Sequence, residues 1–285
     1  MKHIFIINPA AGSRDRTADY SEKIHIACHE RNLDYRIEVS AAPGQCFRIA
    51  REAAQTGEEV RLYACGGDGT LNRFVNDTDG LEITKEILYF PAGSGNDFAR
   101  ELGTDGNPVV ITQYLNNLPS VEVNGRRYRF INGVGFGIDG YCCQVGDELK
   151  KIPGKKVNYA AIAVKGLLIH FAARNAKVTV DGKEYAYKKV WIATTMHGHY
   201  YGGGMIPTPE QDRSSGALSL MLFHGAGRFR TLCVFPSIFK GEHVKHTKIV
   251  AVHTGKEITV EFDRPTPLQI DGETILDVTE YTAEL

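Results

Sequence analysis

The stretch Val60-Arg61-Leu62-Tyr63-Ala64-Cys65-Gly66-Gly67-Asp68-Gly69-Thr70 decides the fold of the first half of this chain. It is an apolar strand that runs into a glycine turn and the start of a helix. Ile87-Leu88-Tyr89-Phe90, followed by Pro91-Ala92-Gly93-Ser94-Gly95-Asn96-Asp97, repeats the arrangement. Glycines at such a junction let backbone N–H groups approach a ligand, and the following helix directs its positive end at an anion. Two such turns in one domain predict a polyphosphate site.

A glycine turn after a strand has a second interpretation, because it can simply allow positive φ angles and close helix packing. Each of these two turns, however, also contains an aspartate and a serine or threonine. Carboxylates and hydroxyls are the groups that a magnesium–nucleotide site needs. The polar content therefore favours phosphate binding over packing alone.

Up to about residue 120 the sequence alternates between strand and helix patterns. Strands are predicted over residues 4–7, 35–39, 60–65 and 87–90, and helices over 18–31 and 45–55, from Thr70, after Asn96 and after Pro108. This alternation predicts an α/β domain, residues 1–122, with a doubly wound parallel sheet that binds ligands at the carboxyl ends of its strands. Both glycine turns lie at such ends.

Short alternating apolar runs replace this pattern in the second half, at 176–180, 188–195, 218–223, 247–253, 257–262 and 268–271. Turns are predicted at Asp181-Gly182, Thr254-Gly255 and Asp271-Gly272, and a helix over 159–171. We therefore expect a mostly antiparallel β-sandwich over residues 123–285, with a C-terminal tail that packs back on the first domain. The active site is expected in the cleft between the two domains.

Composition argues against several classes of protein. The net charge of −1 over 285 residues speaks against nucleic acid as a partner, since proteins that bind it usually have a basic excess. The six cysteines have no zinc-like spacing and indicate reduced thiols. No segment approaches the roughly 18 apolar residues of a membrane span, and the N-terminal apolar run is too short for a signal sequence. We expect a cytoplasmic protein.

Four further motifs complete an ordered set with the two glycine turns, at residues 6–12, 133–139, 201–205 and 269–273. The set resembles the diacylglycerol kinase catalytic family, and within it the soluble bacterial lipid kinases related to sphingosine and ceramide kinases. NAD kinases and phosphofructokinases have close variants of the Gly-Gly-Asp-Gly-Thr string alone. The resemblance therefore rests on the order of all six motifs, which span nearly the whole chain.

This resemblance implies ATP-dependent phosphorylation of a lipid hydroxyl, with ATP bound to the first domain. Diacylglycerol is the acceptor that the resemblance favours. The residues that match nucleotide-binding positions are Asn8, Ser40, Gly66, Gly67, Asp68, Gly69, Thr70, Gly93, Ser94 and Asn96. The residues that match acidic positions tied to Mg²⁺ are Asp68, Asp97 and Asp139.

The sequence departs from the family pattern at three places. Ser40 replaces a more usual threonine and keeps the hydroxyl. Ser214 and Ser215 replace acidic residues, one of which helps to bind a structural magnesium in some members, so that metal is not predicted. His197 stands where many members have asparagine, and we expect it to be a surface or cleft residue rather than a metal ligand.

Asp271 is the predicted general base on the same resemblance, with Glu273 as a supporting carboxylate. The acceptor hydroxyl must lie in line with the γ-phosphorus while its proton moves to a nearby carboxylate. Asp271-Gly272 between two apolar runs is also an ideal sequence for a type I′ hairpin turn. Both interpretations can hold together.

Two basic stretches predict a peripheral contact with a membrane surface, where a lipid alcohol substrate would lie. They are Lys150, Lys151, Lys155 and Lys156, and Lys240, Lys245, His246 and Lys248. Cations near an anionic leaflet contribute about 1 kcal/mol each. Alternatively, these residues are ordinary solvated charge. An exposed strand edge could also pair two copies in a homodimer.

Two other functions stay open. An NAD kinase shares the first glycine motif and a β-rich second domain, although the opening Asn-Pro element and residues 270–273 favour a lipid kinase. The missing structural-metal carboxylate suggests a nucleotide-binding regulator without turnover. The acceptor is open as well, because diacylglycerol, monoacylglycerol, phosphatidylglycerol, a sphingoid base and an undecaprenol-like alcohol all offer a hydroxyl.

Overall fold

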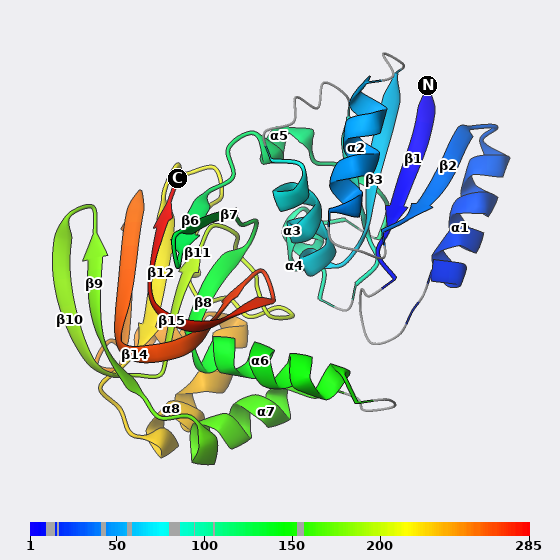
Figure 1. Cartoon of the computed structure of the whole chain (residues 1–285). Coiled ribbons are helices and arrows are strands. Elements are labelled where there is room, and N and C mark those ends of the chain that lie inside the picture. The colour runs from blue at the N-terminus through cyan, green and yellow to red at the C-terminus, as the bar shows by residue number, and fades with distance from the viewer. Residues whose placement is uncertain are drawn as a thin grey trace. The chain divides into compact units, whose positions relative to one another are not determined.

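The computed structural model describes residues 1–9, 15, 17–40, 44–55, 59–79, 86–93, 95–104, 106–152 and 157–285. The chain divides into two compact units, Met1–Leu118 and Pro119–Leu285, each described here by itself (Figure 1). The predicted boundary between residues 122 and 123 falls inside strand β6 (Ser120–Val123), which pairs with two strands of the second unit.

The first unit is built on a five-stranded sheet in the order β2-β1-β3-β4-β5. Its first four strands are parallel, and the fifth runs antiparallel to β4. The strands are β1 (Lys2–Ile7), β2 (Asp34–Val39), β3 (Val60–Gly66), β4 (Ile87–Pro91) and β5 (Val109–Val110). The helices are α1 (Thr17–Glu30), α2 (Gln45–Gln55), α3 (Asp68–Asp77), α4 (Asp97–Glu101) and α5 (Thr112–Leu115).

Both faces of the central strands β1 and β3 are buried, which explains their continuous apolar sequences, whereas the edge strand β2 is only partly buried. Phe5 and Ile7 of β1 pack with Tyr20 and Ile24 of α1 in one core. The alternate residues of β1 point to the other face and are also buried, and α2 and α3 contact each other and β3. The doubly wound α/β prediction is confirmed. The helix predicted after Pro108 begins only at Thr112, because two valines first extend the sheet as β5.

The second unit is a largely antiparallel β structure with the strand order β13-β12-β11-β8-β14-β15-β6-β7, and β9 joins β10 to β14. Residues 268–270 of β14 pair with β8, whereas residues 258–262 pair with β9. Side chains from both regions share one core, so the predicted antiparallel sandwich is confirmed. The strands are β6, β7 (Arg126–Arg129), β8 (Gly133–Gly137), β9 (Arg174–Val180), β10 (Lys183–Val190), β11 (Ile192–Met196), β12 (Leu218–Phe223), β13 (Val250–Gly255), β14 (Glu257–Ile270) and β15 (Glu273–Glu284).

Two details of this unit differ from the predicted pattern. The separate runs 257–262 and 268–271 belong to one long strand, β14, followed directly by the Asp271-Gly272 turn. Thr254-Gly255, predicted as a turn, forms the end of β13. The C-terminal tail is strand β15, which pairs with β14 and β6 of its own unit.

A helical layer covers a second core of this unit (Figure 1). The predicted helix 159–171 is present as α7 with a π-helical continuation, η1, whereas α6 and α8 were not predicted. None of the helices in the described part of the chain is long and apolar enough to cross a membrane. The helical elements are α6 (Ile138–Lys150), α7 (Tyr159–Lys165), η1 (Gly166–His170), α8 (Arg228–Val234), η2 (Phe235–Lys240) and η3 (Glu242–Lys245).

Candidate functional site

The carboxyl edge of the first sheet collects most of the predicted nucleotide residues. Asn8 follows β1, Ser40 follows β2, Gly67 follows β3 and Gly93 comes two residues after β4. Because these four strands are parallel, their carboxyl ends meet at one edge. Backbone hydrogen bonds join the segments, from the Ser40 N–H to the Ile7 carbonyl (2.8 Å) and from the Ala92 N–H to the Gly66 carbonyl (2.8 Å).

The two glycine turns touch each other through their backbones. A Cβ added to Gly93 would overlap the Cα of Gly67 and lie 2.9 Å from its nitrogen, and a Cβ on Gly67 would lie 3.0 Å from the Cα of Gly93. A Cβ on Gly66 would likewise overlap the buried side chain of Thr70. The glycines were predicted for close approach to a ligand, and their visible role is close approach of one loop to the other.

Asn96 shapes the second glycine turn. Its Oδ1 accepts from the Gly93 N–H (2.9 Å) and from the Tyr89 hydroxyl (3.3 Å), and its Nδ2 donates to the Gly93 carbonyl (2.9 Å). Its φ of 51° is left-handed, a conformation that asparagine tolerates better than most residues. Ser94, another predicted nucleotide residue, lies outside the described residues, as do residues 10–12 of the opening motif.

Asp68 holds the start of α4. Its Oδ2 accepts from the Asp97 N–H (3.0 Å) and its Oδ1 from the Phe98 N–H (3.1 Å). These are N–H groups at the beginning of a helix, which have no partner within the helix itself. The protein's own carboxylate therefore occupies the α4 end that was expected to face phosphate. The first turn of α3, whose N-cap Gly67 has no side chain to cap it, is the better candidate for an anion.

Ser40 and the two acidic residues complete this edge. Ser40 is buried, and its Oγ accepts a hydrogen bond from the Cys46 thiol (3.1 Å). Burial and then the charges of Asp68 and Asp97 raise the pKa of the Tyr89 hydroxyl, so both carboxylates act on the same point. Mg²⁺ is usually held by one or two carboxylates together with substrate phosphates, a requirement that Asp68 and Asp97 fit.

The predicted third magnesium residue, Asp139, lies at the start of α6 in the second unit. Burial raises its pKa to about 6, although hydrogen bonds from Gln269 and Tyr201 oppose the shift. Gln269 donates from Nε2 to Asp139 Oδ2 (2.9 Å) and accepts at Oε1 from the Gly272 N–H (2.6 Å). Within the described residues, no group of three or more His, Cys, Asp or Glu side chains is arranged to hold a metal ion.

Asp271 occupies the predicted hairpin turn. With φ of 46° at Asp271 and 94° at Gly272, the two residues link Ile270 to Glu273, which pair directly, so the type I′ turn is confirmed. The carboxylate is bonded as well: Oδ2 accepts from the Ile131 N–H (2.6 Å), and Oδ1 from those of Asn132 (2.8 Å) and Gly133 (3.0 Å).

These three N–H donors stabilise the charged carboxylate and fix its direction. Asp271 is 9% exposed, whereas Glu273, the predicted supporting carboxylate, is an exposed first residue of β15. The structure thus gives Asp271 an architectural role, and its role as general base stays a prediction.

Arg213 and His197 support the segment that binds Asp271. Arg213 donates from Nη1 to the Ile131 carbonyl (2.6 Å), and the N–H groups of His197 and Gly198 donate to the Asn132 carbonyl (2.9 Å each). The expectation that His197 is a surface or cleft residue is wrong, because it is only 3% exposed. Burial, and then the charge of Arg213, lowers its pKa to about 3.

Sequence reasoning missed Gln269 and Arg213 as members of this network. Gln269 lies inside the motif at residues 269–273, and this position is the sequence signal that could have identified it. Arg213 lies in a polar loop beside Ser214 and has no local signal, because its acceptors are about 80 residues away along the chain.

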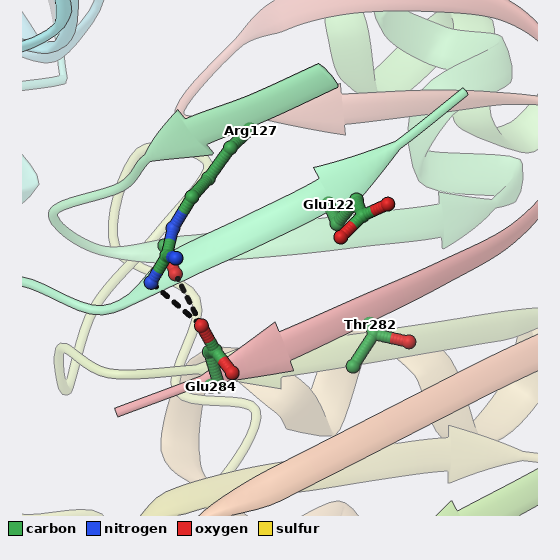
Figure 2. A pocket seen from close by; sticks show the side chains of 5 residues that line it. Glu122, Arg127, Thr282 and Glu284 are labelled. Atoms are coloured by element: carbon green, nitrogen blue, oxygen red, sulfur yellow. Dashed lines mark hydrogen bonds and ion pairs between the residues drawn. The ribbon is translucent and has the colours of Figure 1, made fainter. Parts of the chain in front are cut away.

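A small cavity lies elsewhere in the second unit, near strands β6, β7 and β15 (Figure 2). Its volume of about 50 Å³ is far below that of a nucleotide or lipid site. Across it, Arg127 pairs with Glu284 at 2.6 Å, and both side chains are largely exposed. No predicted site residue lines this cavity, so it is not part of the candidate site.

Comparison with known proteins agrees with the two-unit description. Residues 2–123 match the family described as diacylglycerol kinase catalytic domain, and residues 132–282 match the YegS C-terminal NAD kinase beta sandwich-like domain. A diacylglycerol kinase of Mycobacterium tuberculosis is 29% identical over 237 residues, covering 80% of this chain and 75% of the relative. A diacylglycerol kinase of Bacillus subtilis is 26% identical over 280 residues, covering 94% and 88%.

Among solved structures, a diacylglycerol kinase from Bacillus anthracis superposes with a TM-score of 0.63. It is 20% identical, and the match covers 99% of this chain and 93% of that one. At this identity the likeness shows a shared fold.

Proposed function

Because the chain belongs to the family that joins a diacylglycerol kinase catalytic domain to a YegS C-terminal domain, we propose that it is a lipid kinase that transfers the γ-phosphate of ATP to diacylglycerol. The observation that supports this most is the pair of glycine turns, packed backbone to backbone at the carboxyl edge of a parallel sheet. Ligands of doubly wound sheets bind at this edge. The matched relatives named diacylglycerol kinase support the acceptor.

The first unit supplies the nucleotide site in this proposal. The polyphosphate meets the first turn of α3, where helix N–H groups and the positive end of the helix dipole favour an anion. Asp68 and Asp97 would hold Mg²⁺, which would offset charge on the phosphate oxygens when bound. The loop–loop contact between Gly67 and Gly93 fixes where these groups lie.

The second unit supplies Asp271 as the group that orients the acceptor. The hydroxyl oxygen forms a bond to the γ-phosphorus, the bond from that phosphorus to the β,γ-bridging oxygen breaks, ADP leaves and the hydroxyl proton passes to Asp271. A carboxylate held by three N–H groups has a fixed direction. This suits a loose transition state, in which positioning contributes more than proton removal.

The test is transfer of label from γ-labelled ATP with Mg²⁺ to a panel of lipid alcohols in mixed micelles, with NAD in a separate tube. We expect labelled phosphatidic acid, and loss of the product when Mg²⁺ is chelated. Labelled NADP would instead assign the protein to the NAD kinases, whose fold the second domain's family description mentions. ATP binding without any labelled product would leave a nucleotide-binding regulator.

A further inference from the structure

Large apolar side chains are exposed on the helical layer of the second unit. Ile169 is 67% exposed, Phe229 77% and Phe239 52%. Val164 on α7 and Leu168 on η1 are exposed as well. We refer to these five residues, on α7, η1, α8 and η2, as the helical patch.

The helical patch belongs to neighbouring elements. Arg228, at the start of α8, donates from Nη1 to the carbonyls of Leu167 (2.9 Å) and Phe171 (2.6 Å), which ties α8 to η1. η1 continues α7, and η2 continues α8. Figure 1 shows α7 and α8 in the same region of the second unit, and α8 contacts η1, which continues α7.

The outward apolar side chains are not needed for the core beneath. Ile162, Leu167 and Ile238 point inward from the same elements and pack in the buried cluster around Trp191 and Phe223. These helical elements are therefore apolar on their inner side and again on part of their outer side. Exposed apolar side chains that gather on one face typically mark an interaction surface.

The charged residues of the two segments that carry the patch are all basic, and Glu242, directly after the second segment, lies near Lys240. Residues 157–172 and 225–241 contain no aspartate or glutamate. The exposed charged side chains within them are Lys165, Arg230 and Lys240. An apolar face with cations and without anions complements an anionic lipid surface.

The two basic stretches predicted from the sequence fit this role less well. Lys150 pairs with Asp147 at 3.0 Å, and Lys245 pairs with Glu242 at 3.1 Å. Lys155 and Lys156 lie outside the described residues. Ion pairing within the protein reduces the charge available to a membrane, so the case for docking moves to the helical patch.

We propose that the helical patch docks the second unit on an anionic bilayer. Leu168, Ile169 and Phe229 enter the boundary between headgroups and acyl chains, while the neighbouring cations meet lipid phosphates. The inference rests on the proposed function, because a kinase whose acceptor lies in a bilayer works at the bilayer surface.

Co-sedimentation with lipid vesicles, without ATP or diacylglycerol, tests the docking directly. Wild-type protein binds vesicles of phosphatidylglycerol and phosphatidylcholine more tightly than vesicles of phosphatidylcholine alone. The double variant Ile169→Ser, Phe229→Ser loses at least about tenfold in affinity, since each side chain inserts apolar surface. A matched control, Val252→Ser, Leu276→Ser, changes exposed apolar residues of β13 and β15 and binds as wild type does.

A charge series tests the cations separately. Each of Lys165→Gln, Arg230→Gln and Lys240→Gln lowers affinity for the anionic vesicles about fivefold, the factor that corresponds to about 1 kcal/mol per charge. Thermal unfolding of every variant verifies that it is folded. Equal vesicle binding by wild type and the Ile169→Ser, Phe229→Ser variant overturns the proposal. So does a wild-type dimer that this variant dissociates, because the patch is then a self-interface.

The docking and the kinase activity can fail separately. If the protein phosphorylates a water-soluble short-chain diacylglycerol but does not bind vesicles, the docking is wrong and the proposed function stands. If it binds anionic vesicles through the patch but phosphorylates no lipid, the docking stands and the proposed function is wrong. We expect the Ile169→Ser, Phe229→Ser variant to phosphorylate short-chain diacylglycerol at the wild-type rate and diacylglycerol in vesicles more slowly than wild type does.

Discussion

Asp68 in the first unit and Asp271 in the second are both bonded to backbone N–H groups through both carboxylate oxygens. Asp68 binds the start of α4, only 29 and 30 residues further along the chain. Asp271 binds the start of β8, 138 to 140 residues earlier. In the parallel sheet the carboxylate joins two neighbouring strand ends, whereas in the antiparallel unit it joins a hairpin turn to a distant strand.

The two units keep their loops in place by different means. The first unit relies on the absence of side chains, since Gly67 and Gly93 allow two backbones to touch. The second unit relies on side-chain hydrogen bonds, in which Gln269 and Arg213 surround the segments next to Asp271. A substitution that adds side-chain volume should therefore disturb the first unit most. A substitution that removes a hydrogen bond or a charge should disturb the second unit most.

Gly93→Ala has the largest expected effect on nucleotide binding. The added Cβ would overlap the Cα of Gly67, a backbone atom, so the two loops must separate. This separation disrupts the predicted phosphate-binding turns, and we expect a loss in affinity for Mg-ATP on the order of a hundredfold by titration calorimetry, which corresponds to about 2.8 kcal/mol. Gly227→Ala is the matched control, because its Cβ would meet nothing within 4 Å. Unchanged affinity in Gly93→Ala would show that the loop contact does not shape the site.

Asp139→Asn tests the cost of a buried charge in the second unit. The folded-state pKa of Asp139, about 6, lies above the ordinary 3.8, so the unfolded chain releases this proton first as the pH rises. Wild-type protein therefore loses about 3 kcal/mol of stability between about pH 4 and pH 6, and the loss is constant above that. The asparagine side chain of the variant does not ionise, so the variant lacks this loss.

Urea denaturation at a series of pH values measures this difference. The free energy of unfolding of Asp139→Asn should gain about 3 kcal/mol on that of wild type between about pH 4 and pH 7. The contribution of His197 has the opposite sign, because its pKa is lowered, but it is present in both proteins and cancels. If the difference in unfolding free energy between the two proteins does not vary with pH, ionisation of the buried Asp139 does not lower the stability of the wild type.

The smallest expected effect compares two capping carboxylates. Asp68→Asn leaves one N–H of α4 facing an amide NH₂, and we expect a loss of about 1–3 kcal/mol in unfolding free energy. Asp181 accepts from the Lys256 and Glu257 N–H groups through Oδ1 alone, at 2.9 Å each, so Asp181→Asn keeps its acceptor. Chemical denaturation of both variants decides the matter, and equal losses would argue against the two-oxygen cap.

Local patterns in the sequence predicted the architecture of both units, and the structure gathers most of the predicted nucleotide residues at the carboxyl edge of the first sheet. Continuous apolar strands followed by glycine turns are local signals, and the Asp271-Gly272 turn is another. Strand β8 was not predicted as a strand, because three of its five residues are glycines. The structure explains all three glycines, since an added Cβ would overlap the side chain of Met196 at Gly133, the carboxylate of Asp139 at Gly135 and the carbonyl of Trp191 at Gly137.

The hydrogen bonds of the site could not be predicted in the same way. That Asp68 would cap α4 rather than leave its N–H groups to a phosphate follows only from the contact between the loops. The donors to Asp271 are separated from it by most of the second unit's sequence, and only strand pairing brings them together. Spacing along the chain has no information on such contacts.

We propose that the first unit binds the nucleotide and that Asp271 of the second unit orients the acceptor hydroxyl. The most direct test of this proposal is Asp271→Asn, with ATP affinity and single-turnover transfer to diacylglycerol measured on one folded preparation. We expect ATP affinity close to that of wild type and transfer slower by about 10²- to 10⁴-fold. Transfer at the wild-type rate, or a parallel loss of ATP affinity, would contradict it.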